Sequence, residues 1–474
     1  MMYEDRPLVQ ALENFQKQWP TSFHVPGHKH GALSGLPEVL QDALSYDVTE
    51  LTGLDDLHEP TEAILKAEEK LSKLYGSIRS FFLVNGSTVG NLAMLYATAD
   101  KDDIVLVQRN AHKSVFHAIE LIGAQAVFLT PEWDEQTQTA GGVSVETVKA
   151  AFREYKDIKA AIFTSPTYYG MVNMELKEIV NICHAYDVPV LVDEAHGAHF
   201  VVNKSFPYHA LDLGADIVVQ SAHKTLPAMT MASFLHIRSK LVQPEQVAHF
   251  LHMLQSSSPS YLLMASLDDA RHYADTYKEA DYAYFQIYRL QLLRGLRSIP
   301  TIEVMEVDDA LKLLVRVEGY SGFELQEALE QQGIYPELAD LYQVLLVLPL
   351  VKVGHAGLPV DLESKFKCAV DMLRISKASA PQQILHLPAM PVSAVAYNTA
   401  QLREMKSEWV AIVDAKERVA AESIVPYPPG IPLLCAGERA LEEHVRQLQN
   451  LLDAGSRFQG ALDHQTKQIK VVIE

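Results

Sequence analysis

Short apolar runs that alternate with segments of helical periodicity constrain the fold of this chain more than any other feature. Six runs have the length of a strand: residues 80–84, 103–108, 125–130, 159–165, 188–194 and 215–221. Residues 60–76 and 174–186 have the apolar spacing of helices, and Gly76 is placed to end the first. Because buried strands that alternate with helices form parallel sheets, the pattern predicts an α/β protein whose mostly parallel sheet is covered on both faces.

The rest of the chain suggests further parts. The first 60 residues lack sustained periodicity, so we expect a short helix followed by an irregular arm. A long helical stretch is predicted over about residues 262–296, and an α+β pattern follows it. With 474 residues the chain has room for two or three domains. We therefore predict an N-terminal arm over 1–60, a large domain over 61–296 and a smaller α+β region over 297–474.

Charge and cysteine content exclude several classes of protein. The formal net charge of −20 argues against nucleic acid and anionic membranes as partners, since both attract basic surfaces. The three cysteines are far apart and form no disulfide framework, which favours a reducing compartment. The chain shows no secretory signal pattern, and no apolar run reaches the roughly 18 residues of a membrane span. We expect a cytoplasmic protein without a nucleic-acid or membrane partner.

The residues that follow the apolar runs are the first candidates for a site, because open parallel sheets bind ligands at the carboxyl ends of their strands. Gly86, Ser87 and Thr88 follow the run 80–84 and begin a helical segment. Free N–H groups and the positive end of the helix dipole suit a phosphate at such a place. The alternative is an ordinary helix N-cap made by Ser87 or Thr88.

An acid ends the run 188–194. Asp193 can hold a protonated ring nitrogen, or it can cap the loop that follows it. The segment "DEAHGAH" also permits a metal site made by Asp193, His196 and His199, and the two histidines are equally consistent with ordinary loop residues. The residues alone leave these alternatives open.

Three lysines directly follow a histidine: Lys29, Lys113 and Lys224. Of these, only Lys224 follows an apolar run in the same series of strands as Asp193. Partial burial lowers the pKa of a lysine and makes its neutral amine available as a nucleophile, which a Schiff-base lysine requires. The alternative is a solvated loop lysine. In the "NAHKS" pair, His112 is the more interesting residue, because it can stack on a planar ring or simply be satisfied within its loop.

A phosphate-binding turn, an acid and a lysine at the ends of strands of one sheet together predict pyridoxal 5′-phosphate (PLP) as cofactor. The turn would hold the phosphate, Asp193 the ring nitrogen, and Lys224 the aldehyde carbon. No metal is expected.

Motifs spread over about residues 23–438 resemble the bacterial ornithine/lysine/arginine decarboxylase family, which has the aspartate-aminotransferase fold (PLP fold type I). They include "FHVPGHKHG", "LVNGSTVGN", "VLVDEAHGAH", "SAHKTL" and "QSSSPSYLLMASLD". The resemblance implies a PLP-binding large domain, a smaller α+β C-terminal domain and a decarboxylase. One departure is local, since Cys435 and Ala436 stand where a proline is expected before Gly437.

The resemblance also implies residue roles. Lys224 is similar to the lysine that binds the cofactor covalently, and Asp193 to the partner of its ring nitrogen. His112 is similar to the histidine stacked on the ring, with Ala195 packed on the opposite face. His196 is expected near the cofactor's phenolic oxygen or the substrate carboxylate.

Hydroxyl groups dominate the implied phosphate shell. It consists of Gly86, Ser87, Thr88, Ser221 and His223. Ser256 or Ser257 resembles the hydroxyl that reaches the phosphate of a neighbouring subunit, which implies a homodimer with shared active sites. The large inducible members of the family carry an additional N-terminal wing domain, for which the arm over 1–60 is too short, so their decameric assembly is not assumed.

The implied reaction is loss of CO2 from a basic amino acid. The short, wingless form favours arginine, giving agmatine for polyamine synthesis, with lysine or ornithine as alternatives. The cationic tail of the substrate needs an acid, for which the candidates are Glu50, Asp55, Asp56 and Glu337.

Two other functions remain open. Transamination on the same fold would require an arginine such as Arg374 or Arg403 to hold the α-carboxylate. The other is a non-catalytic paralogue that binds PLP or a partner protein.

Overall fold

The computed structural model describes residues 3–373, 390–426, 431–453, 458–463 and 465–474. The chain forms two compact units, and it passes between them several times. The first contains residues 1–98, 113–118 and 183–278, and the second contains residues 99–112, 119–182 and 279–474. The predicted three-part division stays a prediction.

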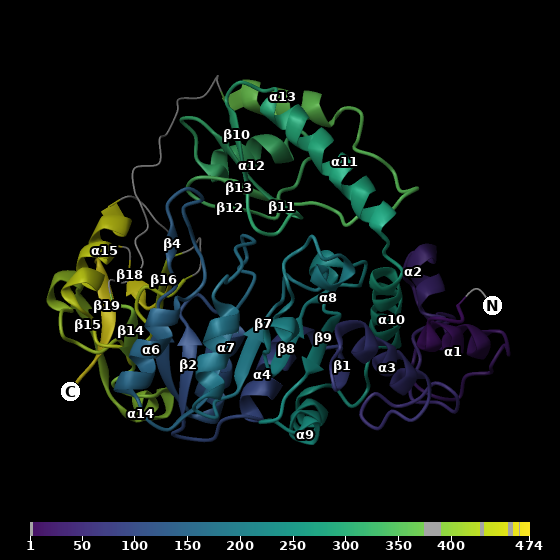
Figure 1. Ribbon diagram of the computed structural model, residues 1–474, viewed down its shortest axis with the longest axis horizontal. Coiled ribbons are helices and arrows are strands. Elements are labelled where there is room, and N and C mark those ends of the chain that lie inside the picture. Colours follow the sequence, from purple (N-terminus) through teal and green to yellow (C-terminus); the bar gives the residue numbers. More distant parts are fainter. Residues whose placement is uncertain (1–2, 374–389, 427–430, 454–457, 464) are drawn as a thin grey trace. The chain divides into compact units, whose positions relative to one another are not determined.

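The first unit contains four adjacent strands. Their order is β1 (Arg79–Leu83), β9 (Ser233–Ile237), β8 (Ile217–Gln220) and β7 (Val190–Asp193) (Figure 1). β7 and β8 are parallel, while β9 runs antiparallel to both β8 and β1. The carboxyl ends of β1, β7 and β8 therefore lie at the same edge, as the sequence predicted. The antiparallel strand β9 was not predicted.

Helices cover both faces of these strands. α4 (Gly86–Tyr96) packs on one face and contacts all four strands. α3 (Ala63–Tyr75) covers the other face, where the Tyr75 ring stacks on His236 with 4.2 Å between the ring centroids. α3 ends at Gly76 as predicted, because Gly76 adopts a φ of 66° that favours glycine.

The arm and the remaining helices complete the first unit. They are α1 (Pro7–Gln16), α2 (Glu38–Ala43), the four-residue α8 (Ala222–Thr225), α9 (Pro244–Leu254) and α10 (Tyr261–Asp275). The buried Asp268 on α10 accepts a hydrogen bond from the backbone N–H of Leu8, which fixes the first turn of α1. The arm is therefore attached at its start to the rest of the first unit.

The helical stretch predicted over about residues 262–296 forms two helices. α10 ends at Asp275, and α11 (Glu279–Arg297) begins after three residues in the second unit. The hydroxyl of Thr276 donates to the carbonyl of His272 and closes the last turn of α10. Apolar spacing continues through this break, so the sequence pattern does not reveal it.

The second unit contains several groups of paired strands. The first has the order β6 (Ile158–Thr164), β2 (Ile104–Gln108), β3 (Gln125–Leu129) and β14 (Val392–Ala394). β2 is parallel to both of its neighbours, and β14 adds an antiparallel edge. α6 (Val145–Glu154) packs against β3, and α7 (Leu176–His184) follows β6.

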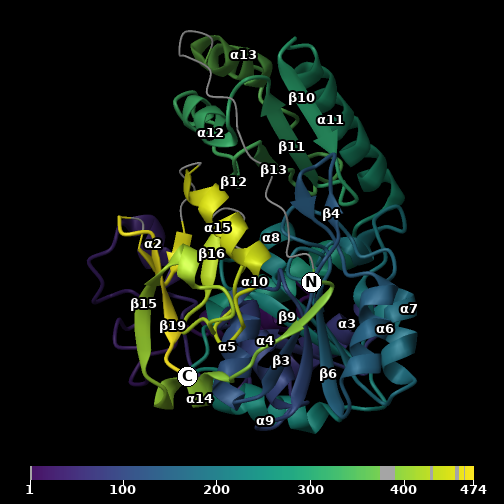
Figure 2. The same ribbon diagram turned by 90° about the vertical axis from the view of Figure 1, so that its left-hand side faces the viewer.

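The second sheet is entirely antiparallel. Its order is β10 (Ile302–Glu306), β11 (Lys312–Val317), β13 (Val344–Val347) and β12 (Leu338–Ala339). It is accompanied by α11, α12 (Gly322–Glu330) and α13 (Leu362–Leu373). α12 and α13 lie side by side, as Figures 1 and 2 show.

The last part of the chain forms small sheets and a helix. The strands are β15 (Ser407–Ala411), β16 (Ile424–Pro426), β17 (Phe458–Gly460), β18 (Leu462–Asp463) and β19 (Gln468–Val472). α15 (Glu442–Asp453) buries Leu448 and Leu451 in the cluster that these strands form.

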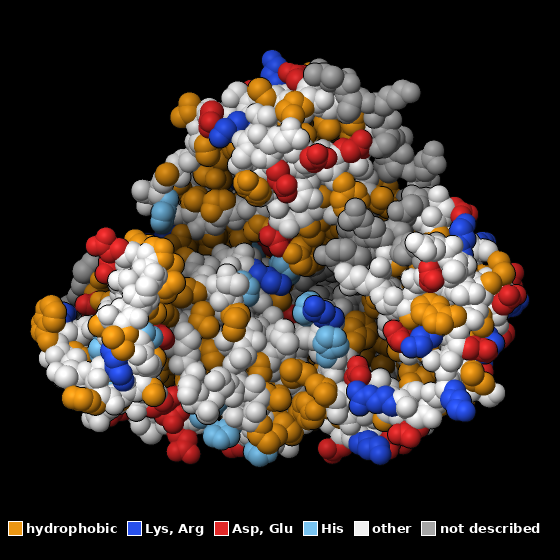
Figure 3. Space-filling view, turned by 180° about the vertical axis from the view of Figure 1, so that it is seen from behind, with side chains coloured by type: hydrophobic (Ala, Val, Ile, Leu, Met, Phe, Trp, Pro, Cys, Tyr) orange, Lys and Arg blue, Asp and Glu red, His pale blue; other side chains and the backbone are white. Residues whose placement is uncertain are grey.

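Surface residues are mixed in type. On the face seen in Figure 3, acidic, basic and hydrophobic side chains are interspersed. None of the helices in the described part of the chain combines the length and the apolar character needed to cross a bilayer.

A buried ion pair holds the C-terminal segment to β2 within the second unit. Arg109 is 0% exposed and donates to both carboxylate oxygens of Glu438, at 2.9 and 2.6 Å. Its other bonds go to the hydroxyl of Ser393 and the carbonyls of Pro432 and Leu433, so all five N–H groups have partners. Glu438 belongs to the segment in which Cys435 and Ala436 depart from the family pattern, and its contacts are complete despite that departure.

Removing one partner of this pair should destabilise the protein strongly. Glu438→Gln leaves the Arg109 guanidinium buried without a counter-charge, which costs about 3–5 kcal/mol in buried pairs. Urea denaturation should show this loss in the free energy of unfolding. Glu442→Gln breaks the exposed pair with Lys416 and serves as the control, with an expected change of about 0–1 kcal/mol. Equal effects of the two variants would contradict a structural role for the buried pair.

Candidate functional site

Lys224 lies at the carboxyl end of β8, in the short helix α8. Its side chain is half-buried, and its Nζ atom lies 3.1 Å from Nε2 of the buried His196. By contrast, Lys113 is exposed at the start of α5 (Lys113–Ile122), and Lys29 donates to the carbonyl of His24 in the arm. Among the three His-Lys lysines, Lys224 has the surroundings that a nucleophilic amine requires.

Asp193 ends β7 and is 2% exposed. Its Oδ2 accepts a hydrogen bond from Nδ2 of Asn91 at 2.8 Å, and its Oδ1 accepts one from the backbone N–H of Ala195 at 3.1 Å. Both partners are neutral N–H donors. A carboxylate in this setting is suited to a protonated ring nitrogen.

The N-terminus of α4 lies at the same edge. Gly86 has a φ of 77°, which favours glycine, and no described side chain caps the helix. The predicted alternative, an N-cap by Ser87 or Thr88, is therefore wrong. The hydroxyl of Ser221, at the end of β8, donates to the hydroxyl of Ser87 at 2.8 Å. Helix N–H groups and two hydroxyls at one place suit a phosphate.

The acid next to Asp193 has a different environment. Glu194 is 1% exposed and accepts hydrogen bonds from the backbone N–H of Ala210 at 2.7 Å and from Nε2 of Gln220 at 2.6 Å. Burial raises the pKa of Glu194 to about 8. The chain of contacts continues from Gln220 to His236 at 3.1 Å and from His236 to Ser80 at 2.8 Å. Burial also lowers the pKa of His236 well below its ordinary value.

The "DEAHGAH" residues do not gather around one point. The His199 ring packs edge-on against Phe200 and Phe206, while the carboxylate of Asp193 is directed to Asn91. In the part of the chain that the structure describes, no three His, Cys, Asp or Glu side chains are arranged to hold a metal.

Three further residues were predicted to contact the cofactor ring or its phosphate. Ala195 is buried beside Asp193, and His223 is half-buried with Nδ1 3.1 Å from the carbonyl of Ala232. Thr88 is exposed one residue beyond Ser87. The roles of these residues in cofactor binding stay predictions.

The residues expected to meet the ring and a second subunit are exposed. His112 belongs to the second unit, at the end of β2. Ser256 and Ser257 lie after α9, where the backbone N–H of Ser256 donates to Oδ1 of Asn85, next to Gly86. Their proposed contacts with the cofactor stay predictions.

Asp55 has a structural role in this fold. Its carboxylate accepts hydrogen bonds from the backbone N–H groups of Thr61, Glu62 and Ile64 at 2.8–2.9 Å, and it thereby caps the start of α3. The carboxylate of Asp55 already accepts hydrogen bonds from the start of α3, so the structure does not support the expectation that it binds the substrate tail.

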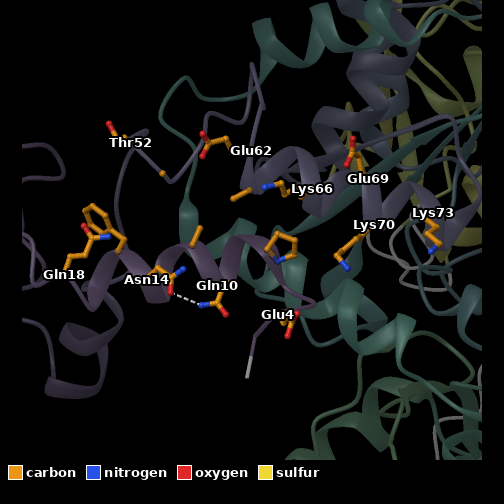
Figure 4. A pocket seen from close by; sticks show the side chains of 15 residues that line it. Glu4, Gln10, Asn14, Gln18, Thr52, Glu62, Lys66, Glu69, Lys70 and Lys73 are labelled. Atoms are coloured by element: carbon orange, nitrogen blue, oxygen red, sulfur yellow. Dashed lines mark hydrogen bonds between the residues drawn. The ribbon is translucent and has the colours of Figure 1, made fainter. Parts of the chain in front are cut away.

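A pocket of about 720 Å³ lies between α1 and α3, away from these residues (Figure 4). Charges of both signs line it, from Lys66, Lys70 and Lys73 and from Glu4, Glu62 and Glu69. The balance of charge favours neither an anion nor a cation, and none of the predicted site residues lines this pocket.

The residues at the ends of β1, β7 and β8 fit PLP. A phosphate would lie at the uncapped N-terminus of α4, beside Ser87 and Ser221. Asp193 would hold the ring nitrogen, and Lys224 would bind the aldehyde carbon. The sequence reasoning missed Asn91 and Glu194, although a polar residue in the apolar helical segment "VGNLAML" was a visible signal for Asn91.

Glu194 should make stability depend on pH. Its pKa is about 8 in the folded protein against an ordinary value of 4.5, so the folded state holds this proton more tightly than the unfolded chain. The protonated carboxyl group of Glu194 stabilises the folded state fully below about pH 4.5, and this contribution is lost as the pH rises towards 8. Glu194→Gln is neutral throughout and should flatten this part of the profile, measured by thermal unfolding between pH 5 and pH 8.

The exposed Glu146 provides the control, because Glu146→Gln should leave the profile unchanged. A profile of Glu194→Gln that is parallel to that of the wild type would show that the carboxyl group of Glu194 does not titrate in this range.

Comparison with known proteins places this chain in a family. Residues 6–296 match the major domain of Orn/Lys/Arg decarboxylases, and residues 378–464 match their C-terminal domain. An arginine decarboxylase of Bacillus subtilis is 33% identical over 100% of this chain and 99% of its own length. An uncharacterised protein of the same organism, YaaO, is 44% identical over 99% of this chain and 98% of its own length.

The fold has solved counterparts. The constitutive lysine decarboxylase of Escherichia coli superposes with a TM-score of 0.78 at 19% identity, and the match covers 99% of this chain and 82% of that one. The predicted fold class, family and cofactor are thereby confirmed. The chain belongs to the Orn/Lys/Arg decarboxylase family and is a PLP-dependent amino-acid decarboxylase of fold type I.

Proposed function

We propose that this decarboxylase acts on arginine and produces agmatine and CO2, which would serve polyamine synthesis. The observation that carries the proposal is the match to the arginine decarboxylase of Bacillus subtilis along essentially the full length of both chains. The lysine decarboxylase with the same fold is less similar and extends beyond the matched region. Lysine and ornithine are the alternative substrates, since the three amino acids differ only in the tail.

In this proposal most of the cofactor site is built at the carboxyl ends of β1, β7 and β8. Lys224 binds PLP covalently, Asp193 holds its ring nitrogen, and Ala195 packs on the ring. The phosphate is bound by the start of α4 and nearby side chains, namely Gly86, Ser87, Thr88, Ser221 and His223. His112 supplies the second ring contact. When bound, PLP acts as an electron sink for the electrons that CO2 leaves behind at Cα.

Proton transfer is assigned to Lys224 and His196. Their nitrogen atoms are 3.1 Å apart, so a proton can pass between Nζ and Nε2. Either residue can then protonate Cα of the substrate after CO2 departs. Partial burial around this pair limits competition from water.

An acid must bind the guanidinium of arginine. Glu337 is exposed and accepts a hydrogen bond from the hydroxyl of Tyr168, which orients its carboxylate. Glu50 and Asp56 are the other candidates, whereas Asp55 is used by α3. A bidentate contact between a carboxylate and a guanidinium would favour arginine over the amines of lysine and ornithine.

Transamination is the second candidate function. It would need an arginine to hold the α-carboxylate. Arg403 is exposed on α14 (Thr399–Glu404) and pairs with Glu120, and Arg374 lies outside the described residues. No observation favours this function over decarboxylation.

A substrate panel tests the proposal. CO2 release from arginine should exceed release from lysine and ornithine by at least tenfold in kcat/KM, and Lys224→Ala should abolish it. The products should be separated to detect any keto acid. Faster release from lysine or ornithine would contradict the assigned substrate, and a keto-acid product would contradict the assigned reaction.

The homodimer with shared active sites is a further part of the proposal, and it is supported by the exposure of Ser256 and Ser257. Lys224→Ala and the double variant Ser256→Ala/Ser257→Ala should each be inactive alone. Co-expression of the two chains with different tags should give hybrid dimers with one intact site and about half of the wild-type activity. Hybrid dimers as inactive as their parents would contradict a shared site.

A further inference from the structure

Asn91 is a fully buried amide in the middle of α4, with 0% of its surface exposed. Its neighbours Val89, Gly90, Ala93 and Met94 are apolar and buried as well. Burying a primary amide among apolar residues is unfavourable unless its polar atoms have partners. The position therefore calls for an explanation that helix packing alone does not give.

The amide has a specific partner in the cofactor site. Nδ2 of Asn91 donates to Oδ2 of Asp193 at 2.8 Å and to the hydroxyl oxygen of Ser114 at 2.9 Å. The opposite orientation would place the amide oxygen against the carboxylate, so Asp193 fixes the direction of the amide. No described residue donates to Oδ1 of Asn91. The amide of Asn91 thus donates to Asp193, while its own oxygen accepts no hydrogen bond from a described residue.

The absence of a side chain at Gly90 allows the amide of Asn91 to come within hydrogen-bonding distance of Asp193. A Cβ atom at position 90 would lie 2.8 Å from Cδ1 of Leu83 and 2.8 Å from Cγ1 of Val219, so α4 approaches β1 and β8 more closely than a larger residue would permit. The contact between Ser87 and Ser221 occurs one helical turn before Asn91. Helix α4 is therefore bonded to the ends of β8 and β7 by two side chains four residues apart.

Asp193 depends on few donors. Among the described residues it has only Asn91 and the backbone N–H of Ala195, and no lysine, arginine or histidine forms an ion pair with it. N–H donors favour a carboxylate over a carboxylic acid and fix its orientation. Without Asn91, one oxygen of the buried carboxylate would lose its charge-assisted bond.

We propose that Asn91 is the positioning residue for Asp193, because its amide holds the carboxylate oriented towards the ring nitrogen of PLP. The inference rests on the proposed role of Asp193 in binding the cofactor. Asn91 itself need not touch the cofactor. This role makes the third residue of the "VGN" segment part of the cofactor site, one turn after the phosphate-binding end of α4.

Affinity for PLP, rather than activity, provides the test. PLP is titrated into the apo-protein at pH 5.5 and pH 8.5, and each variant is compared with the wild type at the same pH. Asn91→Leu removes the donor with similar volume and should weaken PLP binding by about 10- to 100-fold at both pH values. Asn173→Leu removes a different buried amide, which donates to the carbonyl of Val143, and should leave PLP affinity within about threefold.

Asn91→Asp gives a signature that a merely structural role would not produce. Its carboxyl group can donate to Asp193 only when protonated, and two adjacent carboxylates share one proton at acidic pH. Affinity for PLP should therefore be within about threefold of the wild type at pH 5.5 and should fall at least as far as that of Asn91→Leu at pH 8.5. The variant is nearly isosteric with the wild type, so it also controls for a folding defect of Asn91→Leu.

The outcomes separate the inference from the function on which it rests. If Asp193→Ala weakens PLP binding but Asn91→Leu does not, the positioning role is wrong and the proposed role of Asp193 stands. Equal weakening of Asn91→Asp at both pH values would also overturn the positioning role. If Asp193→Ala binds PLP as tightly as the wild type, the assignment of Asp193 fails, and the inference fails with it.

Discussion

A buried carboxylate with only neutral N–H donors is the interaction on which the site depends. Asp193 lies at the end of β7, almost without solvent contact, and its two oxygens accept from Asn91 and Ala195. A charge in this position is unfavourable until a cation meets it. We propose that the partner of this acid is the protonated ring nitrogen of the cofactor.

The neighbouring acid, Glu194, has different surroundings from Asp193 although both lie at the end of β7. Glu194 points to the opposite face, where it accepts a hydrogen bond from Gln220, which in turn contacts His236, and burial raises the pKa of Glu194 to about 8. Two adjacent buried negative charges would repel each other. The raised pKa of Glu194 therefore reduces the repulsion beside Asp193.

Much of this arrangement could be predicted from the sequence, because buried parallel strands consist of nearly continuous apolar runs. β1, β2, β3, β6, β7 and β8 were predicted, and so was the edge at which Lys224 and Asp193 lie. The strand β9 was not, since the buried polar residues Ser233 and His236 interrupt its apolar pattern. The break after α10 was hidden for the opposite reason, because apolar spacing continues through it.

Contacts between distant residues could not be predicted in the same way. Asn91 and Asp193 are 102 positions apart, and an amide within a helix ordinarily indicates a solvated face. Asp55 illustrates the reverse error, since an acid in a loop is a plausible substrate contact until the backbone N–H groups of α3 are seen to use it. Both roles depend on geometry that no local pattern contains.

We propose that Lys224, and neither of the other two His-Lys lysines, binds PLP. Reduction of the PLP-loaded protein with sodium borohydride fixes the cofactor on its lysine, and peptide mapping by mass spectrometry then identifies that residue. We expect the label on the peptide that contains Lys224, in stoichiometric amount. A label on Lys29, on Lys113 or on no lysine would contradict the account.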